Sequence, residues 1–213
     1  GFGFVEVGTV TPLKQYGNPK PRVFRLVEDE ALINRLGFNN LGAKNILDRI
    51  SSNKQIGLLG VNIGPNKDTT DRLKDYIECL KTFYKVADYI TINISSPNTP
   101  GLRSLQLKSN LNPLLKCITK KRDIYYKKSM RKIPLVLKIS PDLKKQDLKN
   151  IALMCLKYKL QAIIATNTSN NKKLFGDNVF SKTKGGISGN ALFNYSNSTL
   201  KELQKFTKGK IQI

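Results

Sequence analysis

The sequence of 213 residues contains no histidine. This absence excludes Ser-His-Asp and Cys-His catalysis, and metal sites built on imidazole, from the chemistry of the chain itself. Long apolar runs are also missing, since none approaches the roughly 20 residues that a membrane-spanning helix requires. The apolar residues are spread along the whole chain, which indicates a globular protein with a sizeable core and excludes disordered and collagen-like classes.

Cysteines are few and far apart. Cys79, Cys117 and Cys155 form no pair at the C-x-x-C spacing of a metal site, and three is an odd number for a disulfide framework. We therefore expect three reduced thiols, each on a helix.

Acidic residues are scarce, because 15 Asp and Glu stand against 37 Lys and Arg, for a formal net charge of +22. Such a charge can mark a surface for nucleic acid or an anionic membrane. The densest stretch, residues 116–132, also holds Tyr125 and Tyr126, a mixture that single-strand binders use. The lysines are nevertheless scattered over the whole chain. We therefore prefer a solvated surface in a lysine-rich protein, with nucleic-acid binding as the alternative.

Short apolar runs recur along the sequence and predict strands buried on both faces of a parallel sheet. Helical patterns lie between them at 69–86, 105–124 and 146–158, and the second contains Pro113, which should start or interrupt a helix. This alternation predicts β/α units in one domain over residues 1–213, with residues 15–26 as an irregular or hairpin insert. The expected strands are 4–7, 58–63, 89–94, 134–139 and 162–167, and residues 211–213 would start a sixth.

Polar residues close each of the five expected strands. In α/β barrels and open sheets, ligands bind at the carboxyl ends of the strands. One asparagine at such a place can be a structural amide, but five strands ending this way predict a polar floor under a ligand. The residues are Gly8 and Thr9, Asn62, Asn93, Lys138, and Thr166 with Asn167.

Lys138 is unusual because it lies inside an apolar run, Val136 to Ile139. A buried ammonium is costly without an anion or strong acceptors. Two interpretations stay open. The side chain extends from the strand end to solvent, or it faces an electron-accepting group that becomes anionic, as a flavin does on reduction.

The loop at 93–103 is stiffened by two prolines and a glycine, so that Ser96, Asn98 and Thr99 are held in place. Its two amides suit a planar molecule with imide and carboxylate edges, and a plain Ser/Pro/Asn turn is the alternative. The glycine cluster at 185–189 allows close backbone approach to a ligand, although any tight turn can use such a cluster.

Together these motifs resemble the class 2, quinone-dependent dihydroorotate dehydrogenases, which are flavoproteins of pyrimidine synthesis. The resemblance implies a TIM-type (β/α)8 barrel, represented here by five to six of its eight strands. It also implies bound FMN with dihydroorotate stacked against the isoalloxazine. The matching segments follow the family's order and are residues 1–12, 33–40, 93–103, 138–143, 166–168 and 185–189.

The resemblance also implies roles for single residues. Ser96 would be the base that removes the C5 proton of dihydroorotate while a hydride leaves C6 for flavin N5. Thr99 would relay the proton through a water, and Phe38 would shield the site from solvent. Serine in place of the cysteine of class 1 relatives implies a quinone as the final oxidant. Substrate contacts would fall on Asn34, Asn93, Asn98, Asn167 and Thr168, and FMN contacts on Gly8, Thr9, Asn62, Asn93, Lys138, Thr166 and Gly186.

The chain departs from the family at both ends. It begins at Gly1 without a methionine or a signal-peptide pattern, and it stops at Ile213 in what resembles the start of a strand. The family's flanking segments are missing, so we expect a piece of about two thirds of a longer barrel enzyme.

The resemblance further implies a monomer that associates peripherally with a membrane through segments outside this chain. The expected location is the cytoplasmic face of a bacterial inner membrane, with the mitochondrial inner membrane as the alternative. No nucleic-acid partner and no metal are expected. Two other functions stay open: a related FMN-dependent enzyme acting on another pyrimidine, and a basic nucleic-acid-binding protein without catalysis.

Overall fold

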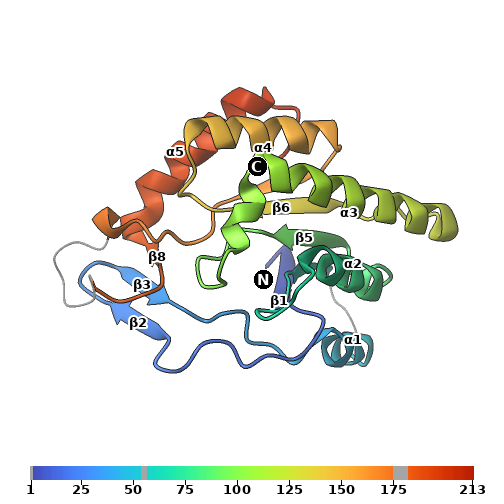
Figure 1. The fold of residues 1–213 in the computed structure, drawn as a ribbon, viewed down its shortest axis with the longest axis horizontal. Coiled ribbons are helices and arrows are strands. Elements are labelled where there is room, and N and C mark those ends of the chain that lie inside the picture. The colour runs from blue at the N-terminus through green and yellow to red at the C-terminus, as the bar shows by residue number, and fades with distance from the viewer. Residues whose placement is uncertain (1, 54–56, 175–181) are drawn as a thin grey trace.

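The computed structural model describes residues 2–53, 57–174 and 182–213, so Gly1 of the first motif lies outside the described residues. Its centre is a parallel sheet (Figure 1). The predicted five strands are confirmed, although the first continues through Gly8 and Thr9 to Val10 and the fifth ends at Ala165. Gln212 forms a parallel bridge to Ala162, which confirms the start of a sixth strand. In spatial order the strands are β1 Phe4–Val10, β4 Leu58–Ile63, β5 Tyr89–Asn93, β6 Leu135–Ile139 and β7 Ala162–Ala165.

Helices connect these strands and pack along the sheet (Figure 1). Helices were predicted at the places of α2, α3 and α4, whereas α1 and α5 were not predicted. Among the described helices, none is both long enough and apolar enough to cross a membrane. The helices are α1 Ala43–Ser51, α2 Arg72–Phe83, α3 Lys108–Ser129, α4 Lys145–Lys157 and α5 Asn190–Thr207, with short 3-10 helices η1 Leu102–Gln106 and η2 Lys172–Leu174.

The prediction that Pro113 starts or interrupts a helix was wrong. It is the sixth residue of α3, which continues without a break to Ser129. An interior proline loses one backbone hydrogen bond and costs about 3 kcal/mol. Leu111, Leu114 and Leu115 on the same turns are buried in the core, and full burial of each such side chain contributes about 1.5–3 kcal/mol. Packing therefore outweighs the proline.

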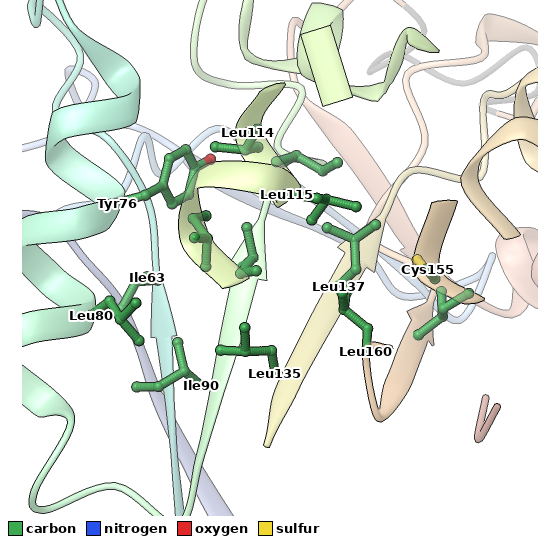
Figure 2. Close-up of a cluster of buried hydrophobic side chains, with 14 of the residues drawn as sticks. Ile63, Tyr76, Leu80, Ile90, Leu114, Leu115, Leu135, Leu137, Cys155 and Leu160 are labelled. Atoms are coloured by element: carbon green, nitrogen blue, oxygen red, sulfur yellow. The ribbon is translucent and has the colours of Figure 1, made fainter. Parts of the chain in front are cut away.

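The main core lies between the sheet and the helices. Strand β6 shows which face of the sheet is covered. Leu135, Leu137 and Ile139 point to one face and are fully buried, whereas Lys138 points to the other face and is only half-buried. Side chains from α2, α3 and α4 therefore meet one face of the sheet. Figure 2 shows Tyr76, Leu80, Leu114, Leu115 and Cys155 of the helices facing Ile63, Ile90, Leu135 and Leu137 of the strands.

The three cysteines are free thiols on helices, as predicted. Cys79 and Cys155 are buried in the core, and Cys117 is half-buried on α3. Burial raises the pKa of Cys79 and of Cys155, so both stay protonated and behave as small apolar side chains.

A small antiparallel sheet completes the fold. Its strands are β2 Val23–Leu26, β3 Ala31–Asn34 and β8 Gly186–Gly189, in that order. The register places Asn34 opposite Gly186. The insert predicted at residues 15–26 covers β2 but misses β3, and the partner β8 comes from a distant part of the chain. Leu26, Ile33 and Ile187 form a separate core for this sheet.

Candidate active site

The side chains at the carboxyl ends of β1, β4 and β5 form one hydrogen-bonded group. Thr9 Oγ1 donates to Asn62 Oδ1 at 2.7 Å. Asn93 Nδ2 donates to Thr9 Oγ1 at 2.9 Å and to Asn62 Oδ1 at 3.2 Å. Asn62 and Asn93 are only 4% and 3% exposed. The structure thus brings together three residues that the sequence placed at three separate strand ends.

Glu6 supports this group from the middle of β1 and was missed by the sequence analysis. Its two carboxylate oxygens accept from Asn62 Nδ2 at 2.9 Å and from Thr91 Oγ1 at 2.7 Å. Burial, and then the charge and hydrogen bond of Glu6, raise the pKa of Tyr89. The one available signal was an acid inside the apolar run at the first strand.

Lys138 lies beside this group on the neighbouring strand, in register with Asn93. With Glu6, Val136 and Ile164 it lines an open groove of about 750 Å³. Its side chain is half-buried, and the described residues offer it no hydrogen-bond or ion-pair partner. The ammonium is therefore free to meet an anion in the groove.

Two threonines after β7 present unused hydroxyls. Thr166 Oγ1 and Thr168 Oγ1 are buried without a hydrogen-bond partner among the described residues. Buried polar atoms are nearly always partnered, so each of these needs an explanation such as a ligand or water.

Glycines allow the loops of the site to approach each other closely. A Cβ added at Gly186 would lie 2.0 Å from Thr168 Oγ1, and one at Gly8 would lie 2.4 Å from the carbonyl oxygen of Asn62. Gly8 also has a φ of 134°, which other residues rarely adopt. Side chains at these two positions would push the strand-end loops apart.

Ser96 follows β5 on the loop that carries the other predicted catalytic residue, Thr99. They are 5% and 4% exposed. Ser96 Oγ accepts from the Asn98 N–H at 3.2 Å. The hydrogen bonds of the described residues include no carboxylate partner for Ser96 and no direct link to the Thr99 side chain.

The predicted substrate residues gather in two hydrogen-bonded groups, and each group includes residues of this loop. In the first group Asn98 Nδ2 donates to the carbonyl and side-chain oxygens of Asn34, at 3.1 and 3.3 Å. In the second group Asn167 Nδ2 donates to Ser95 Oγ at 2.9 Å, and Ser95 Oγ donates to Asn93 Oδ1 at 2.8 Å. Ser95 was not predicted as a site residue, because the resemblance assigns the catalytic role to its neighbour Ser96.

Phe38 packs beside the first two strand ends. A Cβ added at Gly64 would lie 2.9 Å from Phe38 Cε2 and 2.7 Å from Thr9 Cγ2, so the ring and the methyl group both pack on the backbone after β4. Asn40 Nδ2 donates to the Phe38 carbonyl at 2.8 Å and fixes this segment.

Arg103 and Asp142 were also missed as site residues. Arg103 ends the stiff loop after β5, and Asp142 lies in the loop after β6. Their side chains form an ion pair with an Nη1–Oδ2 distance of 2.7 Å. A charged residue in a sequence gives no indication of the distant partner that it will meet.

The basic stretch at 116–132 lies mostly on α3. Tyr125 packs edge-to-face on Tyr84 with ring centroids 5.2 Å apart, and burial raises its pKa. This ring is engaged in the helix packing, so it is not a free platform for stacking on bases. The alternative of nucleic-acid binding is therefore weakened, because one of its two tyrosines is engaged in packing.

Comparison with known proteins gives one consistent family. The family model described as dihydroorotate dehydrogenase matches residues 1–213. Curated relatives named dihydroorotate dehydrogenase (quinone) include those of Rhizobium etli and Bartonella tribocorum, each 49% identical over 205 residues. Each of these alignments covers 96% of this chain and 57% of the relative, so the chain spans less than two thirds of their length.

Solved structures give the same result. DHODH from Eimeria tenella in complex with ferulenol superposes with a TM-score of 0.92 at 36% identity, over 99% of this chain and 62% of that chain. The ligand-free form from the same organism gives 0.91 at 36% identity, over 100% and 65%. The predicted fold class, an α/β chain with five to six strands of a TIM-type barrel, is confirmed.

Proposed function

Because this chain belongs to the dihydroorotate dehydrogenase family, we propose that the protein containing it uses FMN to oxidise dihydroorotate to orotate and reduces a quinone. The observation that carries this proposal is the joined group of hydroxyls and amides at the carboxyl ends of the strands, with Thr9, Asn62 and Asn93 at its centre. This edge is where α/β barrels bind their ligands.

The residues at this edge fit FMN. Lys138 has an ammonium without an anionic partner among the described residues, and the Thr166 hydroxyl is buried and unpartnered. When bound, FMN would accept a hydride and hold the resulting negative charge on its pyrimidine ring. Lys138 would stabilise that charge, while Asn62, Asn93 and the Thr166 hydroxyl would hold the ring edge by hydrogen bonds. The backbone at Gly8 and Gly186 and the Thr9 side chain would complete the cofactor contacts.

Substrate recognition falls to the two amide groups. Asn34 and Asn98 on one side, and Asn167, Thr168 and Asn93 on the other, offer both donors and acceptors. Dihydroorotate has an imide edge that both donates and accepts, and a carboxylate that only accepts. Amides can match both, because each carries one acceptor oxygen and two N–H donors.

Ser96 would take the C5 proton of dihydroorotate at Oγ while hydride leaves C6. A serine hydroxyl is a poor base at neutral pH, and the chain has no histidine to activate it. Its burial excludes bulk water, and the Asn98 N–H fixes its oxygen. Thr99 would pass the proton on through a water, with Phe38 covering the strand ends.

Replacing Ser96 tests this role. We expect Ser96→Ala in the full-length FMN-loaded protein to slow flavin reduction by dihydroorotate by about 10²–10⁴-fold, the scale of a general base. Anaerobic stopped-flow absorbance measures the rate, and the FMN content should stay normal. Ser104→Ala in η1, directly after the loop at 93–103, is the matched control, because that side chain is exposed and, among the described residues, donates to the Gly101 carbonyl alone. Reduction of Ser96→Ala at the wild-type rate would remove Ser96 from this role.

The acceptor and the competing functions are tested with the wild type. Dihydroorotate should bleach the flavin absorbance without oxygen, and an added quinone should restore it. The serine at position 96, where class 1 relatives have cysteine, supports a quinone as the electron acceptor. A flavin that stays oxidised would favour an enzyme for another pyrimidine. A colourless protein with salt-sensitive RNA binding would favour the nucleic-acid alternative.

A quinone acceptor dissolved in lipid supports peripheral membrane association. We extend the proposal to a monomer on the cytoplasmic face of a bacterial inner membrane, with the mitochondrial inner membrane as the alternative. Fractionation of cells that express the full-length protein tests this location. Recovery entirely in the soluble fraction would contradict it.

A further inference from the structure

The guanidinium of Arg103 joins the loops that follow β5, β6 and β7. Its Nε donates to the Ser95 carbonyl at 2.9 Å, and its Nη2 donates to the Thr168 carbonyl at 2.8 Å. Its Nη1 donates to Asp142 Oδ2 at 2.7 Å and to Asn170 Oδ1 at 2.9 Å. One side chain thus reaches three strand-end loops, which only the planar five-donor fork of arginine allows.

Asp142 strengthens this junction from the loop after β6. Its Oδ2 also accepts from the Asn170 N–H at 3.0 Å, and its Oδ1 accepts from the Ser169 hydroxyl. The side chains of Arg103 and Asp142 are 20% and 16% exposed. The pair is therefore only weakly screened by water, and charge-assisted hydrogen bonds of this kind are the stronger ones.

The carbonyls that Arg103 holds lie next to the proposed chemistry. Ser95 precedes the proposed base Ser96, and its hydroxyl is bonded to both Asn93 and Asn167. Thr168 is itself a proposed substrate residue, and its N–H donates to Asn167 Oδ1 at 2.7 Å. Arg103 therefore ties the loop that carries the base to the loop that carries the substrate amides.

We propose that Arg103 is a positioning residue, which fixes the separation between Ser96 and the substrate contacts of Asn167 and Thr168. This inference rests on the proposed function. A misplacement of about 1 Å between reacting groups can cost about 10²-fold in rate. Loss of Arg103 should therefore slow flavin reduction far more than the accompanying loss of folding stability can explain.

The test compares Arg103→Ala and Arg103→Lys with the wild type, in the full-length FMN-loaded protein. We expect Arg103→Ala to lower the single-turnover rate of flavin reduction by dihydroorotate about 10- to 10²-fold, with FMN content unchanged. Arg103→Lys should recover little of this loss, because one ammonium cannot reach three loops. Added guanidinium ion should partly restore the Ala variant, whereas methylammonium should not.

Arg131 offers a matched control at the other end of the sheet. It donates to the carbonyls of Tyr84, Lys85 and Ala87 at 3.1, 2.8 and 2.6 Å, and to Asp88 Oδ1 at 3.4 Å. Arg131→Ala therefore removes a similar number of bonds far from the proposed chemistry. We expect a lower melting temperature, comparable to that of Arg103→Ala, with an unchanged rate of flavin reduction.

Amide hydrogen exchange gives a second measurement that does not depend on the substrate. In Arg103→Ala, residues 95–102 and 166–170 should exchange faster together, and in Arg131→Ala they should not. The proposal is overturned if this exchange is unchanged, if Arg103→Ala slows reduction no more than Arg131→Ala does, or if Arg103→Lys restores the rate fully. If dihydroorotate does not reduce the flavin of the wild-type protein, the proposed function is refuted. The amide hydrogen exchange would still decide the role of Arg103.

Discussion

Each end of the parallel sheet is held by one arginine that binds backbone carbonyls and a carboxylate, but the two ends differ in the groups around that arginine. At the amino end Arg131 donates mainly to the backbone carbonyls of residues 84–87, and its own carbonyl accepts from the Tyr84 hydroxyl. At the carboxyl end Arg103 and its neighbours form a network of side-chain amides and hydroxyls.

This difference separates stability from function within one sheet. At the amino end several polar groups bond to the backbone, as with Asp88 Oδ2, which accepts from the Leu59 N–H at 2.8 Å. The carboxyl end keeps the unpartnered hydroxyl of Thr166 and the free ammonium of Lys138 within the described residues. We infer that these two groups of the carboxyl end are available to a ligand.

The largest effect on stability should come from the middle of the sheet, which belongs to neither end. Leu137 is fully buried against the helices. Leu137→Ala should lower the free energy of unfolding by about 2–5 kcal/mol through lost burial and a cavity. Urea unfolding of the full-length protein measures it. Leu137→Met keeps the volume and should cost less than about 1.5 kcal/mol, and equal losses in the two variants would contradict this account.

A smaller effect is expected at Glu6, below the carboxyl end. Glu6→Ala leaves Asn62 Nδ2 and Thr91 Oγ1 without their acceptor, which should cost about 1–3 kcal/mol. FMN should also be retained less well, because the Asn62 amide is no longer oriented. Glu6→Gln keeps one acceptor oxygen and should lose less of both. Unfolding curves and the flavin absorbance per chain measure these two quantities, and full FMN retention in Glu6→Ala would break the link to the site.

The smallest effects should come from two hydroxyls, one at each end. Tyr76 donates to the Asn93 carbonyl at 2.7 Å, and Tyr84 donates to the Arg131 carbonyl at 2.5 Å. Each Tyr→Phe change should cost about 0.5–1.5 kcal/mol. Burial raises the pKa of Tyr76, so it remains a donor at every working pH.

Only Tyr76→Phe should slow flavin reduction, because only its partner Asn93 belongs to the site. The same stopped-flow assay compares the two variants. If Tyr84→Phe slowed reduction as much as Tyr76→Phe, the distinction between the two ends would fail.

Local patterns made part of this structure predictable. A run such as residues 89–93 is apolar and ends in Asn93, so both the strand and its polar end were visible in the sequence. Pro113 was misjudged because helix propensity is local, whereas the burial that outweighs it depends on the fold. Glu6 and Arg103 were missed as site residues for a related reason, since their hydrogen-bond partners lie on other strands and loops.

The small sheet was hidden by distance along the chain. In its β3–β8 pair, Ser188 Oγ donates to the Leu32 carbonyl across 156 positions. Hydrophobic periodicity describes one segment at a time and gives no information about such a partner. Helix α5 follows β8 directly and was missed in the same part of the chain.

The same pairing fixes the order in which a ribosome can complete the site. Asn34 emerges early in synthesis, and Ser96 and Asn98 follow it. A nascent chain that has not yet reached residue 186 therefore already contains the loop at 93–103, which carries Ser96. It lacks β8, the strand that aligns Asn34 against Gly186. The contact of Asn34 with Asn98 thus depends on a segment made more than 80 residues after the loop at 93–103, so the proposed base is translated well before this contact can be completed.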